Sequence, residues 1–203
     1  MTNINDFSEA TVDPNPFIQF EKWYGEHLES GTEIPDSVTI ATAASDGHVS
    51  ARTVLLKYYD ESGFVFYTNY SSRKGSQLAS NPRAALLFYW PEAGRQVRIE
   101  GIVEKIPDEE SVAYFYTRPR ESQLSACASI QSSVIPDKEH LNALYNYYKD
   151  KYSGREVEKP HEWGGFRIIP EWFEFWQNGE FRLHDRLTFT LKKNDWFLER
   201  LAP

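Results

Sequence analysis

The first regular pattern of hydrophobic residues lies near the start of the chain and has helical spacing. Asn15 followed by Pro16 is typical of a helix start, and large apolar residues then recur every three or four positions up to Gly31, namely Phe17, Phe20, Trp23, Tyr24 and Leu28. We therefore predict an amphipathic helix that begins at Pro16. Residues 1–15 are polar and acidic and lack this pattern, so we expect a flexible N-terminal arm there.

From Val38 onward the pattern changes to short runs of β-prone residues separated by turn residues. The predicted strands cover residues 37–44, 49–59, 64–69, 84–90 and 96–106. A short helix over 72–81 is expected between the third and fourth strands, and Pro82 is expected to end it. This order of elements predicts a meander of antiparallel strands.

Residues 108–153 are helical in character, and the chain then returns to strands. Asp108 is the expected N-cap of a helix over 109–117, Arg118-Pro119-Arg120 ends that helix, and Asp137 opens a longer one that ends at Gly154. Strands are predicted over 166–169, 172–177, 187–192 and 196–201, separated by Pro170, Asn178-Gly179 and Asn194-Asp195. The sum is a mainly β (α+β) fold, a barrel or strongly curled antiparallel sheet with flanking helices, in one domain over 16–203.

Charge and composition exclude several classes of partner. The net charge of −8 and the pI near 5.2 argue against nucleic acid and anionic membranes. No stretch is apolar enough to cross a bilayer, and the first fifteen residues do not resemble a signal peptide. Cys127 is the single cysteine, which excludes an internal disulfide, so the cytoplasm is the expected compartment. The five histidines show no metal-ligand spacing, and no metal is expected.

Two segments of the first half suggest anion binding. Ser71-Ser72-Arg73-Lys74-Gly75 opens the predicted helix after a strand, where free N–H groups, hydroxyls and two cations suit a phosphate. Taken alone, the segment is more often a solvated capping turn without a ligand. Arg52 and Lys57 interrupt an apolar strand and differ in parity, so they would face opposite sides. Surface cations on an edge strand are the alternative.

Two further segments combine cations with aromatic or hydroxyl groups. Tyr114, Arg118 and Ser122 follow each other at intervals of four residues, which suggests a second anion site or, more plainly, a helix C-terminus with a favourable arginine. In an extended segment Arg182, His184 and Arg186 would share one side, beside Trp176. An ion-pair cluster with Glu180 and Asp185 is the competing interpretation.

These segments, in this order, resemble the pyridoxamine 5′-phosphate oxidase family, whose members are FMN-binding split β-barrels acting as homodimers. The similarity runs from about Pro16 to Pro203. The motifs that agree are Arg52 to Lys57, Phe66-Tyr67-Thr68-Asn69, Ser72-Arg73-Lys74, Arg95-Gln96-Val97, Thr117 to Arg120, Gln131-Ser132-Ser133, Trp163-Gly164-Gly165, Glu174-Phe175-Trp176 and Arg182 to Arg186.

The resemblance implies a flavin-dependent oxidase that makes pyridoxal 5′-phosphate, in vitamin B6 biosynthesis or salvage, by passing a hydride from pyridoxamine or pyridoxine 5′-phosphate to N5 of FMN and then electrons to oxygen. It implies an FMN site built from Arg52, Thr53, Val54, Leu55, Leu56, Lys57, Tyr67, Thr68, Arg73, Lys74, Gln96, Gln131, Ser132, Trp176 and Arg186. The substrate phosphate would meet Lys57, Tyr114, Arg118 and Ser122, and the catalytic pair Arg182 and His184 would lie against the substrate ring.

One departure from the family pattern concerns the N-terminal arm. Family members usually have a basic segment ending in tyrosine that closes over the substrate, whereas residues 1–15 contain no Arg, Lys or Tyr. One alternative is therefore a related flavin oxidase acting on a larger aromatic substrate such as a phenazine precursor. A non-enzymatic FMN-binding module and a purely structural domain are two further alternatives. The residues expected at the substrate phosphate favour the phosphorylated substrate.

Overall fold

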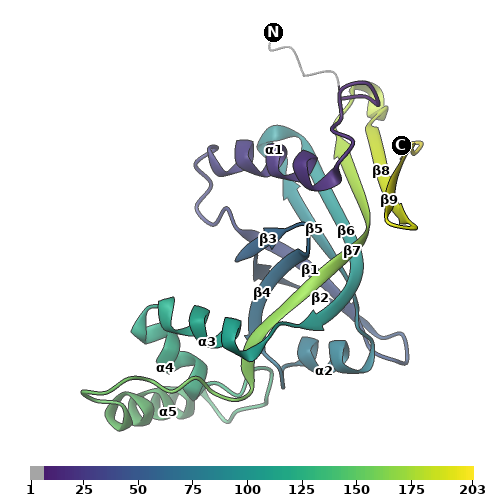
Figure 1. Ribbon diagram of the computed structural model, residues 1–203. Helices are drawn as coiled ribbons and strands as arrows, with labels where there is room; N and C mark the ends of the chain where they lie inside the picture. The colour runs from purple at the N-terminus through teal and green to yellow at the C-terminus, as the bar shows by residue number, and fades with distance from the viewer. Residues whose placement is uncertain (1–6) are drawn as a thin grey trace.

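Antiparallel pairing of nine strands forms one strongly curled sheet in the computed structural model, which describes residues 7–203 (Figure 1). Strand order along the sheet is β2-β1-β5-β6-β7-β4-β3, with β8 paired to β7 and β9 paired to β8. The strands are β1 (Ser37–Ala43), β2 (Val49–Leu55), β3 (Tyr58–Asp60), β4 (Gly63–Asn69), β5 (Arg83–Trp90), β6 (Arg95–Lys105), β7 (Trp163–Gln177), β8 (Asp185–Lys192) and β9 (Asp195–Arg200). The predicted mainly β, curled fold is confirmed.

Helices cover the two ends of this sheet. They are α1 (Pro16–Leu28), α2 (Arg73–Ser80), α3 (Asp108–Thr117), α4 (Arg120–Ala128) and α5 (Lys138–Lys151). Helix α1 begins as predicted, because the Asn15 side chain accepts a hydrogen bond from the Phe17 N–H at 2.9 Å. Figure 1 shows α1 at one end of the sheet and α3, α4 and α5 gathered at the other.

An aromatic core lies between α1 and the sheet. Phe20 is fully buried, and its ring lies 5.0 Å from those of Phe64 and Phe88 in edge-to-face contacts. Each such side chain contributes roughly 1.5–3 kcal/mol through burial. Much of the high aromatic content is therefore explained by the core and needs no ligand.

Strand β7 is longer than predicted. The expected break at Pro170 is wrong, because the proline lies at a β-bulge where the register jumps from Glu100–Trp172 to Gly101–Pro170. A bulge accommodates a residue that lacks an N–H donor, so pairing continues on both sides of it. As a result β7 runs from the α3–α5 cluster to the β8–β9 hairpin (Figure 1).

Other differences arise at proline and at a strand break. The strand expected over 49–59 is divided after Leu55, because the N–H groups of Leu56 and Lys57 turn to the carbonyls of Asp36 and Val65. Asp108 is not an N-cap: Pro107 holds that position. Helix α4 was not predicted; Pro119 both ends the preceding helix and starts the new one, as its fixed φ permits.

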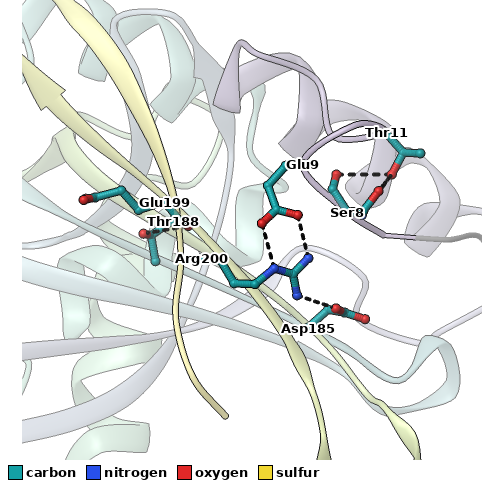
Figure 2. A network of polar contacts seen from close by, with 7 residues as sticks. All are labelled: Ser8, Glu9, Thr11, Asp185, Thr188, Glu199 and Arg200. Carbon is teal, nitrogen blue, oxygen red and sulfur yellow. Dashed lines mark hydrogen bonds and ion pairs between the residues drawn. The ribbon is translucent and has the colours of Figure 1, made fainter.

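Residues 7–15 pack against the domain, which differs from the flexible arm expected over 1–15; residues 1–6 lie outside the described residues. Phe7 is 7% exposed, and its ring lies 4.7 Å from that of Trp23. Both carboxylate oxygens of Glu9 accept hydrogen bonds from Arg200 at 2.8 Å, and Arg200 also binds Asp185 at 2.6 Å (Figure 2). The Arg200 hydrogen bonds lower the pKa of Glu9 to about 2.

No helix in the described part of the chain combines the length and the apolar character needed to span a membrane.

Candidate functional site

A cavity of about 400 Å³ opens where β2 and β4 approach α3 and α4. Its lining combines residues from five regions of the chain: Thr53, Val54, Leu55, Lys57, Tyr67, Thr68, Lys74, Tyr114, Arg118, Pro119, Ser122, Gln131 and Trp163. All of these except Pro119 and Trp163 belong to the predicted FMN or substrate residues. The structure thus brings part of each predicted set to one cavity.

Lys74 lines this cavity and is held there by neutral partners. Lys74 is 8% exposed, and its Nζ donates to Thr68 Oγ1 at 2.9 Å and to Gln131 Oε1 at 2.8 Å. Burial, together with the charge of Arg52, lowers the pKa of Lys74 to about 8. Within residues 7–203, neither Lys74 nor Arg52 nor the exposed Arg73 has a carboxylate partner. Uncompensated positive charge of this kind suits a phosphate dianion.

Helix α2, which carries Lys74, begins where the sequence predicts. Ser72 is its N-cap, and the Ser72 hydroxyl accepts a hydrogen bond from the Gly75 N–H at 3.3 Å. The start of α2 therefore adds free N–H groups beside the cations Arg73 and Lys74.

Arg52 is held by partners that sequence reasoning missed. Its Nη1 donates to Thr42 Oγ1 at 2.7 Å, and its Nη2 donates to Ser50 Oγ. Both hydroxyls donate in turn to Gln77 Oε1, at 2.6 and 2.8 Å. The available signal was helical spacing, since Gln77 follows Lys74 by one turn of α2 and lies on the same face.

A second cation that lines the cavity is an arginine with an unsatisfied buried donor. The guanidinium carbon of Arg118 lies 4.7 Å from the centre of the Trp163 ring. Arg118 Nη1 is buried without a hydrogen-bond partner, and burial lowers the pKa of Arg118. Tyr114 and Ser122 line the same cavity, as their spacing predicted, although α3 and α4 are separate helices. An anion in this position would satisfy the free donor.

Lys57 lines the cavity from the break between β2 and β3, so the parity argument does not apply to it. Its Nζ is paired with Asp36, a partner that was not predicted. Arg52 lies on β2, which is an edge strand of the sheet. Ser132 is exposed beside Gln131 with a φ of 73° and does not line the cavity, and buried Leu56 does not line it either.

The cavity lies at the Trp163 end of β7, and the remaining predicted residues gather near its Gln177 end. Gln96, Trp176 and Arg186 are directly opposite one another on β6, β7 and β8, so their side chains share a face. These three residues are called the Trp176 row. Arg186 Nε donates to Glu174 Oε1 at 2.6 Å, and Glu174 is buried. Glu174 was missed as an anchor, although its spacing of two from Trp176 places it on that face.

The segment between β7 and β8 is a turn, and the prediction of an extended segment is wrong. A 3₁₀ turn covers Glu180–Arg182, and Phe181 and Arg182 have left-handed φ angles of 54° and 64°. Local turn geometry therefore replaces strand alternation. His184 still lies beside Trp176, with ring centres 4.7 Å apart.

The ion-pair alternative for this turn receives no support from the described residues. Asp185 pairs with Arg200, Arg186 pairs with Glu174, and Arg182 has no carboxylate partner in this part of the chain.

The cavity and the Trp176 row are far apart within one chain. Trp163 lies at the start of β7 and Trp176 near its end, and thirteen strand residues span roughly 40 Å. Figure 1 shows these strand ends beside α3–α5 and beside β8–β9 respectively. One chain therefore does not unite Gln96, Trp176, Arg182, His184 and Arg186 with the cavity.

Comparison with known proteins gives consistent matches. The family model described as pyridoxamine 5′-phosphate oxidase matches residues 25–176, and the model described as the pyridoxine 5′-phosphate oxidase C-terminal dimerisation region matches residues 163–203. A relative from a Nostoc species is 51% identical over 98% of this chain and 94% of its own. A relative from Gloeothece citriformis is 52% identical with the same coverage. Both relatives are named pyridoxine/pyridoxamine 5′-phosphate oxidase.

Two solved structures resemble the fold over nearly all of the chain. PhzG from Burkholderia lata, in complex with tetrahydrophenazine-1-carboxylic acid, has a TM-score of 0.91 and 30% identity, covering 97% of each chain. A pyridoxamine 5′-phosphate oxidase-related, FMN-binding protein from Nostoc punctiforme has a TM-score of 0.73 and 16% identity, covering 95% of this chain and 100% of that one. The second likeness concerns the fold alone.

Proposed function

Because the chain belongs to the pyridoxamine 5′-phosphate oxidase family, we propose that it binds FMN and oxidises pyridoxamine or pyridoxine 5′-phosphate to pyridoxal 5′-phosphate. The observation that carries this proposal is a cavity lined by two cations that lack a carboxylate partner. Lys74 and Arg118 both line it, and neither has a carboxylate partner in the described chain. Two phosphate monoesters, one on the flavin and one on the substrate, match these two cations.

The FMN phosphate is assigned to Lys74 and its neighbours. Arg52, Arg73 and Lys74 supply the positive charge, and Thr68 and Gln131 hold the lysine in place. Bound FMN supplies the redox chemistry, taking a hydride from the substrate and passing electrons to oxygen, which leaves as hydrogen peroxide. The other FMN assignments stand as predicted for Thr53, Val54, Leu55, Leu56, Lys57, Tyr67, Gln96, Ser132, Trp176 and Arg186.

The substrate phosphate is assigned to Arg118. Arg118 offers its free Nη1, and Lys57, Tyr114 and Ser122 line the same cavity. These residues bind and orient the substrate. Arg182 and His184 are assigned to its ring: Arg182 keeps its positive charge near the reacting carbon, and both residues orient the substrate for hydride transfer.

The functional unit is a homodimer in which the Trp176 row of one copy completes the cavity of the other. The separation of the two groups along β7 supports this arrangement, because one chain cannot bring them together. The match to a family dimerisation region over 163–203 supports it as well, since that region includes Trp176, Arg182, His184 and Arg186.

A second candidate substrate class is a reduced phenazine, because PhzG shares the fold over the whole chain. The free Arg118 donor and the hydroxyls of Tyr114 and Ser122 favour a substrate that ends in a phosphate. Cytoplasmic localisation is part of the proposal, and cell fractionation checks it.

The deciding experiment is anaerobic mixing of the purified yellow protein with candidate substrates. Pyridoxine 5′-phosphate is expected to bleach the flavin absorbance, whereas pyridoxine and tetrahydrophenazine-1-carboxylic acid leave it nearly unchanged. Bleaching by the phenazine alone would replace the proposed substrate. The double variant Arg73→Ala/Lys74→Ala should be colourless; full flavin retention would refute the phosphate assignment.

A further inference from the structure

The turn between β7 and β8 contains a backbone contact that fixes the chemistry of a side chain. We propose that Gly179 is a positioning residue that holds His184 as the Nε2–H tautomer, so that the imidazole meets the substrate as a hydrogen-bond donor and not as a base. The inference rests on the proposed function, which places His184 beside the substrate ring.

The contact itself is a hydrogen bond from the main chain to the ring. The Gly179 N–H donates to His184 Nδ1 at 3.2 Å. A backbone N–H is only a donor, so Nδ1 must present its lone pair. A neutral imidazole with a lone pair on Nδ1 carries its proton on Nε2.

The ring is also held in orientation. His184 lies against Trp176, with 4.7 Å between ring centres and 44° between ring planes. Its Nδ1 edge faces the main chain of the turn, so the Nε2–H edge points away from Gly179. The indole and the main-chain donor together fix both the position of the ring and the identity of the protonated nitrogen.

Only glycine fits at residue 179. A Cβ there would lie 2.0 Å from the Leu183 carbonyl oxygen, far inside van der Waals contact. The chain returns so sharply because Phe181 and Arg182 adopt left-handed φ angles, which are strained for residues with side chains. This close return brings His184 within reach of a main-chain N–H five residues earlier.

The tautomer limits what this turn can do in the reaction. Nε2–H donates a hydrogen bond and has no lone pair to accept a proton, and the guanidinium of Arg182 is likewise donor only. Both side chains therefore offer donors to an oxygen or nitrogen of the substrate. Neither removes the proton that leaves the substrate hydroxyl or amine, so that proton passes to water.

Nitrogen NMR on the FMN-loaded protein labelled with ¹⁵N-histidine tests the tautomer directly. The His184 signals, assigned by their loss in His184→Ala, should show a protonated Nε2 and an unprotonated Nδ1 at neutral pH. A protonated Nδ1 would overturn the proposal. The unmodified protein gives this result, so the test does not depend on the folding of a variant.

Substitutions test the donor role through anaerobic single-turnover flavin reduction by pyridoxine 5′-phosphate. Glutamine places an N–H donor near the Nε2 position, whereas asparagine reaches only the Nδ1 position. We expect His184→Gln to stay within about threefold of the unmodified rate, and His184→Asn and His184→Ala to fall about tenfold, which is the value of one lost neutral hydrogen bond. The matched control is His161→Gln, because the His161 side chain is 98% exposed and lies outside both groups of site residues.

A rate for His184→Gln as low as that for His184→Ala would show that the imidazole acts as a base, and would overturn the proposal. Flavin absorbance and melting temperature identify any variant that fails to fold, and the NMR result then decides. Failure of the proposed function is distinct: pyridoxine 5′-phosphate would not bleach even the unmodified protein, whereas the His184 tautomer would still be observed.

Discussion

Lys74 shows how a single residue can be prepared for a phosphate without a carboxylate partner. Its ammonium is buried among the neutral oxygens of Thr68 and Gln131, near Arg52. Neutral acceptors orient the lysine but leave its charge available. The cost is a pKa lowered to about 8, since burial penalises the charged form.

FMN affinity is therefore expected to depend on pH through Lys74. The phosphate binds the charged lysine, so affinity should fall as the pH rises above the Lys74 pKa of about 8, by up to about tenfold per pH unit. Titration of flavin-free protein with FMN between pH 7 and 9.5, followed by flavin fluorescence, measures this. The phosphate stays dianionic over that range, so the lysine is the titrating group.

The flavin-free protein should show the opposite trend in stability. Between the folded pKa of about 8 and the usual value of 10.5, the unfolded chain binds more protons at Lys74, so stability rises with pH. Lys74→Met removes both trends. A decline in FMN affinity of the same size in Lys74→Met would assign the titration to another group.

Arg118 is expected to discriminate phosphorylated from unphosphorylated substrate. Arg118→Met removes a charge-assisted contact, so kcat/KM for pyridoxine 5′-phosphate should fall about tenfold to a hundredfold, while the protein stays yellow. Steady-state kinetics with pyridoxine as comparison measure the discrimination. Arg120→Met is the matched control: Arg120 donates to the Tyr152 carbonyl and does not line the cavity. Equal losses in both variants would contradict the assignment.

At the scale of elements, the segment 7–15 acts as a packed extension of α1. Phe7 contacts Trp23 on α1, and Glu9 binds Arg200 on β9, which in turn binds Asp185 at the start of β8 (Figure 2). The segment thereby joins the first helix to the last hairpin. Its apolar contact provides more stability than the exposed ion pair, because solvent screens surface charges.

Removal of the Phe7 ring is expected to destabilise the protein. We expect Phe7→Ala to lower the free energy of unfolding by about 2 kcal/mol, less than at a central core position because the segment can relax toward solvent. Urea unfolding at fixed protein concentration measures the change. The control is Ile18→Ala on α1, where the side chain is 49% exposed and little change is expected. An unchanged midpoint for Phe7→Ala would mean that the segment is not packed in solution.

At the scale of the whole molecule, the length of β7 separates the two halves of the site. The strand is long because the bulge at Pro170 allows pairing to continue, and its two ends hold the cavity and the Trp176 row. In the proposed homodimer, two copies combine to form one complete site. Dissociation of the dimer and loss of flavin are therefore expected together on dilution.

Mixed dimers test this arrangement. Arg118→Met damages the cavity, and Arg182→Leu damages the turn beside the Trp176 row. Each homodimer of one variant therefore has two defective sites. A heterodimer of the two variants has one undamaged site and one doubly defective site. Random exchange makes half of the dimers heterodimers, so about a quarter of the unmodified activity should return. Activity that never exceeds the mean of the two separate variants would place both residues in a site from one chain.

Local chemistry written in the sequence determined much of this protein. Asn15-Pro16 specified the start of α1, Ser72 capped α2, and the spacing of Tyr114, Arg118 and Ser122 predicted a shared site, because caps and helical spacing depend on neighbours in the chain. Only the tertiary structure decided the rest. The pairing partner of Pro170 allowed a continuous β7, and left-handed angles at Phe181 and Arg182 made a turn of the segment expected to be extended. Such features depend on which strand lies opposite and on how sharply the chain must return, and local patterns do not contain that information.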